Sequence, residues 1–336
     1  MICRTLPLLI CAAIIGAIAP SAHAAGAESS LTLAELAAWR EVWPLEVTIE
    51  RGARFQNGRS IEKGQLVSLD QVTPQGLRLA DGTMFFMYPA EKTNVMQMVA
   101  LLNKAMSPEQ RALKMNDARR NDALWPTRVE NRWTMQLDDN TQIAAGSEFV
   151  VLGFLPDGRL KVANIEQNFT VPIDPWETNF FWNARIRVGK DDGLSFSYRL
   201  LESMLEPSTD GTTVADYDYI VMYDGRDSCS RSTIFAPDLA KFQKASAASG
   251  AKWLLVFVNA ASETAVNRDH YRNMNLTGRA AKDGWGSTLH GYFELGGYQT
   301  PWLHVFDRDG NEIATGGAPM DSYSQVLDIL SAKVKR

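Results

Sequence analysis

An internal repeat constrains the N-terminal half of this chain more than any other feature. When the sequence is aligned with itself at an offset of 82 residues, five pairs of identical tryptophan, proline or glycine residues fall into register. They are Trp43 with Trp125, Pro44 with Pro126, Gly64 with Gly146, Pro74 with Pro156 and Gly76 with Gly158. This period exceeds the roughly 20–50 residues of solenoid repeats. The pattern therefore indicates that a small domain has been duplicated.

Each copy has the pattern of short strands separated by tight turns. In the first copy, residues 45–50 alternate apolar and polar side chains, as a half-buried strand does. Asp81-Gly82 stands between two apolar runs and is a strong hairpin signal. In the second copy, Pro156-Asp157-Gly158 is a similar turn. Several short strands of this kind favour a small β-barrel. The strand pattern and size resemble bacterial SH3-like barrels.

Helices are expected to join the two barrels. Residues 95–115 have helical spacing, and Ser107-Pro108-Glu109 is a typical helix start. We expect the barrels to serve as a scaffold or spacer, with ligand binding as the alternative. If the barrels bind ligands, four aromatic residues of the second copy would form a peptide-binding patch. If the barrels are a scaffold, the same residues would be packed in the core. They are Trp176, Phe180, Phe181 and Trp182.

The C-terminal half alternates strands and helices. Strands are expected over residues 219–223, 253–258, 302–306 and 312–315, and helices over residues 233–248, 264–274 and 320–333. The apolar run at 253–258 is unbroken, as in parallel strands covered on both faces. A helix within residues 193–206 should connect this half to the barrels. The insert over residues 275–297 is expected either to wall a groove or to pack against the domain.

A single cysteine stands where the first of these strands turns into a helix. Cys229 begins the run Cys-Ser-Arg-Ser, and Pro237 follows in the helix. Thr300-Pro301 precedes the last pair of strands, and an Asp-x-Asp-Gly hairpin joins that pair. Together with the element order, these motifs resemble the thioredoxin-like superfamily over about residues 212–336. The resemblance implies a thioredoxin-like α/β domain, with Cys229 in the place of the first cysteine of the Cys-x-x-Cys pair.

The resemblance also implies roles for the neighbouring residues. Pro301 would be the family's cis-proline, and the backbone of Thr300 would pair with a bound peptide. Ser228 would take the place of the tryptophan before the first cysteine and contact the substrate. Two departures matter: the second cysteine is Ser232, and the buried acid of typical thioredoxins falls at Tyr223. Only a thiolate releases a mixed disulfide at a useful rate, so ordinary dithiol activity should be absent.

A lone cysteine at a helix start still favours a reactive sulfur. Unpaired backbone N–H groups and the helix dipole stabilise a thiolate there. Arg231 should add to this effect and Asp227 should oppose it. The expected catalytic residues are therefore Cys229, Ser232 and Arg231. The alternative is a buried, inert Cys229.

Residues 1–24 have the pattern of an export signal. Arg4 gives the positive start, residues 6–19 are largely apolar, and Ala22-His23-Ala24 is a typical cleavage site. Cys3 and Cys11 would leave with this segment, so the mature chain would keep one thiol and no internal disulfide. A periplasmic or secreted location follows. The protein would be attached to a membrane only if the leader stayed uncleaved.

Composition excludes other classes of partner. The formal charge of −5 becomes −6 once Arg4 is removed with the leader, which argues against nucleic acid and anionic membranes. None of His270, His290 and His304 has metal-ligand spacing from cysteine or acidic residues, and no nucleotide-binding motif is present. We therefore expect no cofactor and no metal. The expected partners are protein thiols and disulfides or small thiols.

The sequence thus predicts an exported multidomain protein of class α/β plus β. Tandem small SH3-like β-barrels joined by helices would precede a C-terminal thioredoxin-like α/β domain. The expected boundaries are a signal peptide (1–24), an SH3-like barrel with a helical linker (25–118), a second barrel (119–192), a connecting helix and linker (193–211) and a thioredoxin-like domain (212–336). The expected function is thiol–disulfide exchange or mixed-disulfide binding of clients through one thiol. The alternatives are a redox-inactive thioredoxin-fold scaffold of the cell envelope, and barrels that carry the function by binding cell-wall or peptide ligands.

Overall fold

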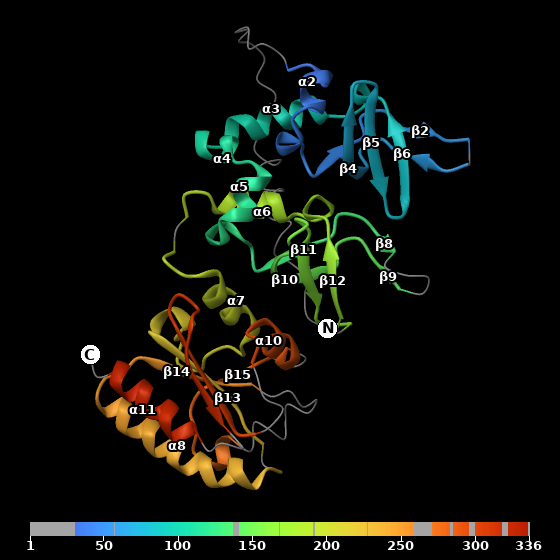
Figure 1. Ribbon diagram of the computed structural model, residues 1–336. Coiled ribbons are helices and arrows are strands. Elements are labelled where there is room, and N and C mark those ends of the chain that lie inside the picture. Colours follow the sequence, from blue (N-terminus) through green and yellow to red (C-terminus); the bar gives the residue numbers. More distant parts are fainter. Residues whose placement is uncertain are drawn as a thin grey trace.

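The structure is a computed structural model of the chain. It describes residues 31–334 except 57, 137–140, 168, 191, 227, 259–270, 283–284, 296–299 and 318–321. The predicted export signal lies outside these residues. Three parts are stacked in chain order in Figure 1. We call them the first β-unit (residues 33–105), the second β-unit (residues 115–187) and the C-terminal domain (residues 193–334).

The two β-units contain the same elements in the same order. In the first, an antiparallel sheet has the order β1-β4-β5-β6, with bounds Glu46–Thr48, Leu66–Thr73, Gly76–Asp81 and Met84–Tyr88. A hairpin of β2 (Ala53–Arg54) and β3 (Ser60–Ile61) accompanies it. Helices α2 (Leu33–Ala37), η1 (Arg40–Val42), η2 (Ala90–Lys92) and α3 (Val95–Ala105) complete the unit.

The second β-unit repeats this plan. Its sheet has the order β12-β11-β10-β7, with bounds Phe169–Ile173, Leu160–Asn164, Glu148–Phe154 and Arg128–Glu130. Its hairpin is β8 (Met135–Gln136) with β9 (Gln142–Ile143). Its helices are α5 (Met115–Arg120), η3 (Asp122–Leu124), η4 (Pro175–Glu177) and α6 (Phe180–Arg187). The elements from α2 to β3 of the first unit correspond to those from α5 to β9 of the second unit, at the offset of 82 residues seen in the sequence. The SH3-like character of the units stays a prediction.

The repeated residues make equivalent contacts in the two units. The indole nitrogen of Trp43 donates to the carbonyl of Leu36 at 2.7 Å, and that of Trp125 donates to Ala118 at 2.9 Å. Each tryptophan therefore ties its unit's first helix to the chain that enters the sheet. Helix α4 (Pro108–Ala112) lies between the units and starts with a capping box at Ser107.

The C-terminal domain is built on a five-stranded mixed sheet of order β15-β14-β13-β16-β17. β13 (Tyr219–Asp224), β14 (Trp253–Phe257) and β15 (Arg279–Ala280) are parallel to one another. β16 (Trp302–Asp307) pairs antiparallel with β13, and β17 (Glu312–Gly317) pairs antiparallel with β16. Its helices are α7 (Phe196–Met204), η5 (Val214–Asp216), α8 (Ser230–Ala248), α10 (Gly286–Tyr292) and α11 (Tyr323–Val334). The strands expected over residues 219–223, 253–258, 302–306 and 312–315 and the helices expected over residues 233–248 and 320–333 are present in the predicted order. In addition, β15 and α10 form within residues 275–297, where the sequence predicted an insert without such elements. The helix expected over residues 264–274 lies mostly outside the described residues.

Helices cover both faces of this sheet. On one face, Val221 and Tyr223 of β13 pack with side chains of α8 and α11. These helices run along the lower side of the domain in Figure 1. On the other face, Ile220 and Met222 pack with α7 and α10. Trp285 and Leu289 of the 275–297 insert are buried in this second core, so this part of the insert packs against the sheet.

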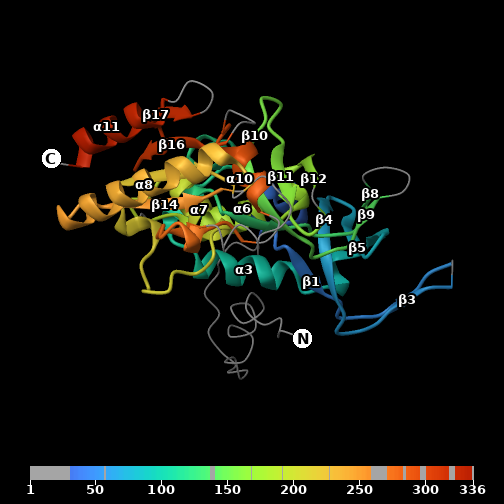
Figure 2. The same ribbon diagram turned by 90° about the horizontal axis from the view of Figure 1, so that it is seen from below.

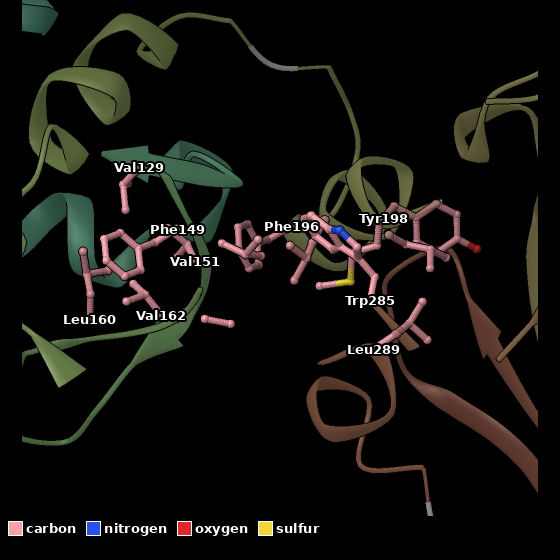
Figure 3. Close-up of a cluster of buried hydrophobic side chains, with 14 of the residues drawn as sticks. Val129, Phe149, Val151, Leu160, Val162, Phe196, Tyr198, Trp285 and Leu289 are labelled. Atoms are coloured by element: carbon pink, nitrogen blue, oxygen red, sulfur yellow. The ribbon is translucent and has the colours of Figure 1, made fainter. Parts of the chain in front are cut away.

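The second core continues without a break into the second β-unit. Phe149, Val151, Leu160 and Val162 of that unit belong to the same buried cluster as α7 and the sheet. Figure 3 shows Phe196 of α7 lying between Val151 and Trp285. Ring contacts connect Phe196 to Trp125 at 5.2 Å and to Tyr292 at 6.3 Å. None of the helices in the described part of the chain is long and apolar enough to cross a membrane.

Candidate functional site

Cys229 lies at the point where β13 ends and α8 begins. It is the N-cap residue of α8, with extended backbone angles of φ −102° and ψ 111°. The first backbone N–H groups of a helix have no partner within the helix, so they point toward groups at this position. The thiol is half-buried, and Cys229 is the only cysteine in the described residues. The site therefore holds one thiol that solvent can reach.

The sulfur faces the loop that leads into β16. Cys229 Sγ lies 3.1 Å from the backbone carbonyl oxygen of Thr300. The peptide bond between Thr300 and Pro301 is cis, as the resemblance implies. Pro301 is buried, while Thr300 is partly exposed beside the thiol. The structure thus brings together Cys229, Thr300 and Pro301, which are about 70 residues apart in the sequence.

Opposing effects act on the pKa of Cys229, and the net result is a lowered pKa. Partial burial raises the pKa because it penalises the thiolate. Hydrogen bonds from the side chains of Thr300 and Ser232, and from the backbone N–H groups of Ser232 and Arg231, lower it by more. The Thr300 carbonyl accepts from the thiol and so favours the protonated form. The donors from Thr300 and from the start of α8 together prevail, and the thiolate is favoured relative to an ordinary cysteine.

Ser232, which the resemblance places where the second cysteine of the pair would be, is fully buried. Its hydroxyl oxygen accepts a hydrogen bond from the backbone N–H of Arg226 at 3.2 Å. The same hydroxyl also hydrogen-bonds Cys229 and thereby lowers the pKa of the thiol. Ser232 therefore fixes the loop before the cysteine and helps to hold a thiolate. A hydroxyl at this position has no route to form a disulfide.

Tyr223 fills the space beneath the site. Its side chain is fully buried and packs against Phe235 and Tyr271, and burial raises the pKa of its phenol. The ring also requires a glycine two residues later. A Cβ atom at Gly225 would lie 2.3 Å from the Tyr223 hydroxyl oxygen. A neutral phenol thus stands where the resemblance places a buried acid.

Asp224 is a buried acid that our sequence reasoning missed. Its side chain is 6% exposed, and one carboxylate oxygen, Oδ1, has no hydrogen-bond partner in the described structure. Burial raises the pKa of Asp224 to about 6, while the charge of Arg226 acts to lower it. Successive residues of a strand point to opposite faces, so this carboxyl lies across the sheet from Tyr223. The signal available in the sequence was an acid directly after an apolar strand.

The remaining predicted site residues are more exposed. Ser228 and Arg231 lie on the surface beside the thiol. Arg231 acts on the pKa of Cys229 through its backbone N–H. Asp227, expected to oppose the thiolate, lies outside the described residues. Ile234, one turn further along α8, is 71% exposed and adds an apolar surface next to the site.

The other candidate residues take structural places. Of the four aromatic residues near the end of the second copy, Phe180 and Phe181 are buried in the core, and Trp176 and Trp182 are half-buried. His304 is buried in β16, where its Nδ1 lies 2.5 Å from Glu312. His270 lies outside the described residues. No group of three or more potential metal ligands occurs in the part of the chain that the structure describes.

Comparison with known proteins gives matches to solved structures alone. No family model matches the chain, and no curated protein matches it. A secreted disulfide oxidoreductase of Mycobacterium tuberculosis is 13% identical with a TM-score of 0.31, covering 38% of this chain and 94% of its own. StoA from Bacillus subtilis is 18% identical with a TM-score of 0.29, covering 37% and 93%. Thioredoxin from Wuchereria bancrofti is 21% identical with a TM-score of 0.29, covering 35% and 90%. A structure named as the thioredoxin domain of a thiol–disulfide oxidoreductase from Bacteroides vulgatus is also similar, at 14% identity with a TM-score of 0.30, covering 38% of this chain and 92% of its own.

Proposed function

We propose that this chain is an exported protein whose C-terminal domain exchanges disulfides with client proteins or small thiols through the single thiol of Cys229. One observation carries the proposal. The half-buried sulfur lies at the start of α8, 3.1 Å from the Thr300 carbonyl, among donors that lower its pKa. A thiolate that solvent can reach is the species that attacks a disulfide.

The proposed reaction has two balanced steps. The Cys229 thiolate attacks one sulfur of a client disulfide, so a mixed disulfide forms and the other client sulfur leaves as a thiolate. A client thiolate then attacks the client sulfur of the mixed disulfide and restores the Cys229 thiolate. The client ends with as many disulfides as it had, so the cycle is an isomerisation and needs no external oxidant or reductant. A small thiol can take the client's place in the second step.

The surrounding residues have separate roles in this scheme. The side chain of Thr300, Ser232 and the backbone of Arg231 stabilise the thiolate. The Ser232 hydroxyl cannot displace the bound client. The backbone of Thr300 and the exposed Ser228 border the position where a client chain would lie. Release of the mixed disulfide therefore depends on the client, which would make the complex long-lived.

The test measures how fast Cys229 is alkylated by iodoacetamide from pH 5 to pH 10, followed by the mass of its peptide. We expect the rate in the folded chain to reach half its maximum at a lower pH than in the same chain unfolded in urea. Ser232→Ala should move the folded midpoint upward, because it removes a donor to the thiolate. Thr233→Ala, an exposed neighbour whose hydroxyl donates to the Cys229 carbonyl, is the matched control and should leave the midpoint in place.

A different outcome would favour the scaffold alternative. If Cys229 in the folded chain is alkylated more slowly than in the unfolded chain at every pH, the thiol is inert and the proposal fails. The C-terminal domain would then serve as a redox-inactive binding module of the cell envelope.

A further inference from the structure

The two β-units differ in the side chains that they present at one edge strand. Strands β6 and β12 occupy equivalent edges of their sheets and have the same alternation of half-buried and exposed residues. At the two exposed positions, however, the first unit has Phe85 and Met87 where the second has Thr170 and Pro172. Phe85 is 37% exposed and Met87 is 53% exposed. The ring of Phe85 also contacts Trp133 of the second unit at 5.8 Å and the guanidinium of Arg78 at 4.7 Å. The first unit therefore presents two partly exposed apolar side chains at this edge, and Met87 is the more exposed of the two.

The backbone of β6 is also open for pairing at this edge. A two-residue turn joins β5 to β6, so its closing pair, Asp81 and Met84, is hydrogen-bonded. Hydrogen-bonded and non-hydrogen-bonded pairs alternate along an antiparallel ladder. The N–H and C=O groups of Phe85 and Met87 therefore point away from β5. Within the described residues they have no backbone partner.

The second β-unit closes the same edge with a proline. Pro172 is equivalent to Met87 and pairs in register with Lys161 of β11. Proline has no N–H group, so it is tolerated where the N–H would face outward, and it prevents another strand from pairing there. The second unit thus protects its edge strand β12 with a proline, whereas the first unit leaves its edge strand β6 open and apolar.

Basic side chains stand beside the open edge. The β2–β3 hairpin extends away from the first sheet in Figure 2, and it is fixed to β6 by the ring contact of Phe55 with Phe86 at 5.0 Å. The hairpin and its flanks, residues 51–63, carry four basic residues and one acid in a chain whose formal charge is −5. The basic residues are Arg51, Arg54, Arg59 and Lys63, and all four are exposed. This local charge favours a partner with carboxylates.

We infer that the edge of β6 binds an extended polypeptide segment that carries acidic residues, by adding it to the sheet as a further strand. The open N–H and C=O groups of Phe85 and Met87 would pair with the segment's backbone, and their side chains would contact its apolar residues. The carboxylates would lie near the basic hairpin. A second copy of this chain is a poorer occupant, because pairing β6 with itself would bring two basic hairpins together. This site is independent of Cys229.

The test uses the full chain and a fluorescein-labelled peptide, Glu-Glu-Thr-Val-Thr-Val-Thr-Glu-Glu, followed by fluorescence anisotropy. The key variant is Met87→Pro, which copies the second unit and removes one outward N–H. We expect it to weaken binding by about tenfold or more, the effect of losing one hydrogen bond and blocking its neighbour. Met87→Thr keeps the N–H and should weaken binding less. Leu66→Thr, an exposed apolar residue on an inner strand, is the control and should bind as wild type does.

Hydrogen exchange gives a second readout that needs no variant. Added peptide should slow exchange of the Phe85 and Met87 amides and leave those of Thr170 and Val171 unchanged. Equal affinity of wild type and folded Met87→Pro, or equal binding of a peptide with lysine in place of each glutamate, would overturn the inference. The inference would also be overturned if the wild-type chain bound no peptide but formed a dimer, and Met87→Pro converted that dimer to a monomer. The occupant of the edge would then be a second copy of the chain.

Discussion

At the scale of single residues, the site stabilises charge with neutral donors. The groups that lower the pKa of Cys229 are hydroxyl and backbone N–H groups, and the guanidinium of Arg231 lies exposed on the surface. The dipoles of Ser232 and of the Arg231 backbone are fixed by α8, and that of Thr300 lies in the loop before β16. Such dipoles are screened by salt much less than a surface ion pair is. The reactivity of Cys229 should therefore depend on the integrity of the helix start more than on ionic strength. Ser232 has two roles here: it holds the loop before Cys229 in place, and its hydroxyl stabilises the thiolate.

The buried carboxyl of Asp224 makes stability depend on pH. Burial raises its pKa to about 6 in the folded chain, against about 4 when unfolded. Folding thus favours the protonated form, so this contribution is complete below about pH 4 and is lost as pH rises through about 6. We expect Asp224→Asn to raise the free energy of unfolding at pH 7.5 by up to about 3 kcal/mol relative to its effect at pH 4. Urea unfolding at the two pH values measures the difference.

An exposed carboxyl provides the comparison for this variant. Asp238 lies on the surface of α8, and Asp238→Asn should change stability little at either pH. The expectation for Asp224 fails if its asparagine variant has the same effect at pH 4 and pH 7.5. Such a result would mean that the carboxylate is solvated or paired in the folded protein.

At the scale of elements, two arginines join the two β-units: Arg132 is half-buried and Arg185 is buried. The guanidinium of Arg132, in the second unit, donates to the carbonyl of Trp176 at 3.1 Å and to that of Leu45, in the first unit, at 2.7 Å. It also donates to the carbonyl of Leu69. Arg185 of α6 is 1% exposed and donates to the carbonyl of Glu41. Burial lowers the pKa of both arginines to about 10, so both stay charged at neutral pH.

Removing Arg132 should separate the first β-unit from the rest of the chain. Arg132→Ala leaves three carbonyl groups without their charged donor, and we expect it to cost about 3 kcal/mol. Because the first unit has its own core, it should then unfold in a separate, earlier transition. Differential scanning calorimetry would show two peaks where the wild type shows one. Arg120→Ala, an exposed arginine at the end of α5, should keep a single peak; two peaks in both variants would contradict the role of Arg132.

The sequence predicted local patterns well and distant contacts poorly. The duplicated strands, the helix start at Cys229 and the hairpin turns depend on a few neighbouring residues, so periodicity and turn chemistry indicated them. Arg132 and Arg185 stabilise the fold by binding backbone carbonyls far away in the sequence, and any surface arginine has the same local pattern. Asp224 was missed for the same reason. Its burial is set by the sheet and the elements packed on it.

At the scale of the whole molecule, α7 is part of the C-terminal domain's core as well as a connection to it. Leu200, Leu201 and Met204 are 0–1% exposed and pack on the sheet face that carries Ile220 and Met222. Glu202 binds Arg279 through two hydrogen bonds of 2.8 Å each. The second β-unit reaches the same core through Phe196 (Figure 3). The site at Cys229 is therefore held in a fixed position relative to the second unit.

This shared core predicts how the chain tolerates truncation. A fragment of residues 212–336, the predicted thioredoxin-like domain, lacks α7 and exposes the sheet face that α7 covers. Losing three fully buried side chains at about 2 kcal/mol each removes about 6 kcal/mol, which is comparable with the whole stability of a domain. We expect this fragment to be a loose, partly folded state, a fragment of residues 193–336 to fold with reduced stability, and residues 115–336 to match the full chain. Amide dispersion in NMR spectra and near-UV circular dichroism distinguish the three. A peptide of residues 193–211 added to the shortest fragment should restore its dispersion, and native dispersion without that peptide would show that the sheet does not need α7.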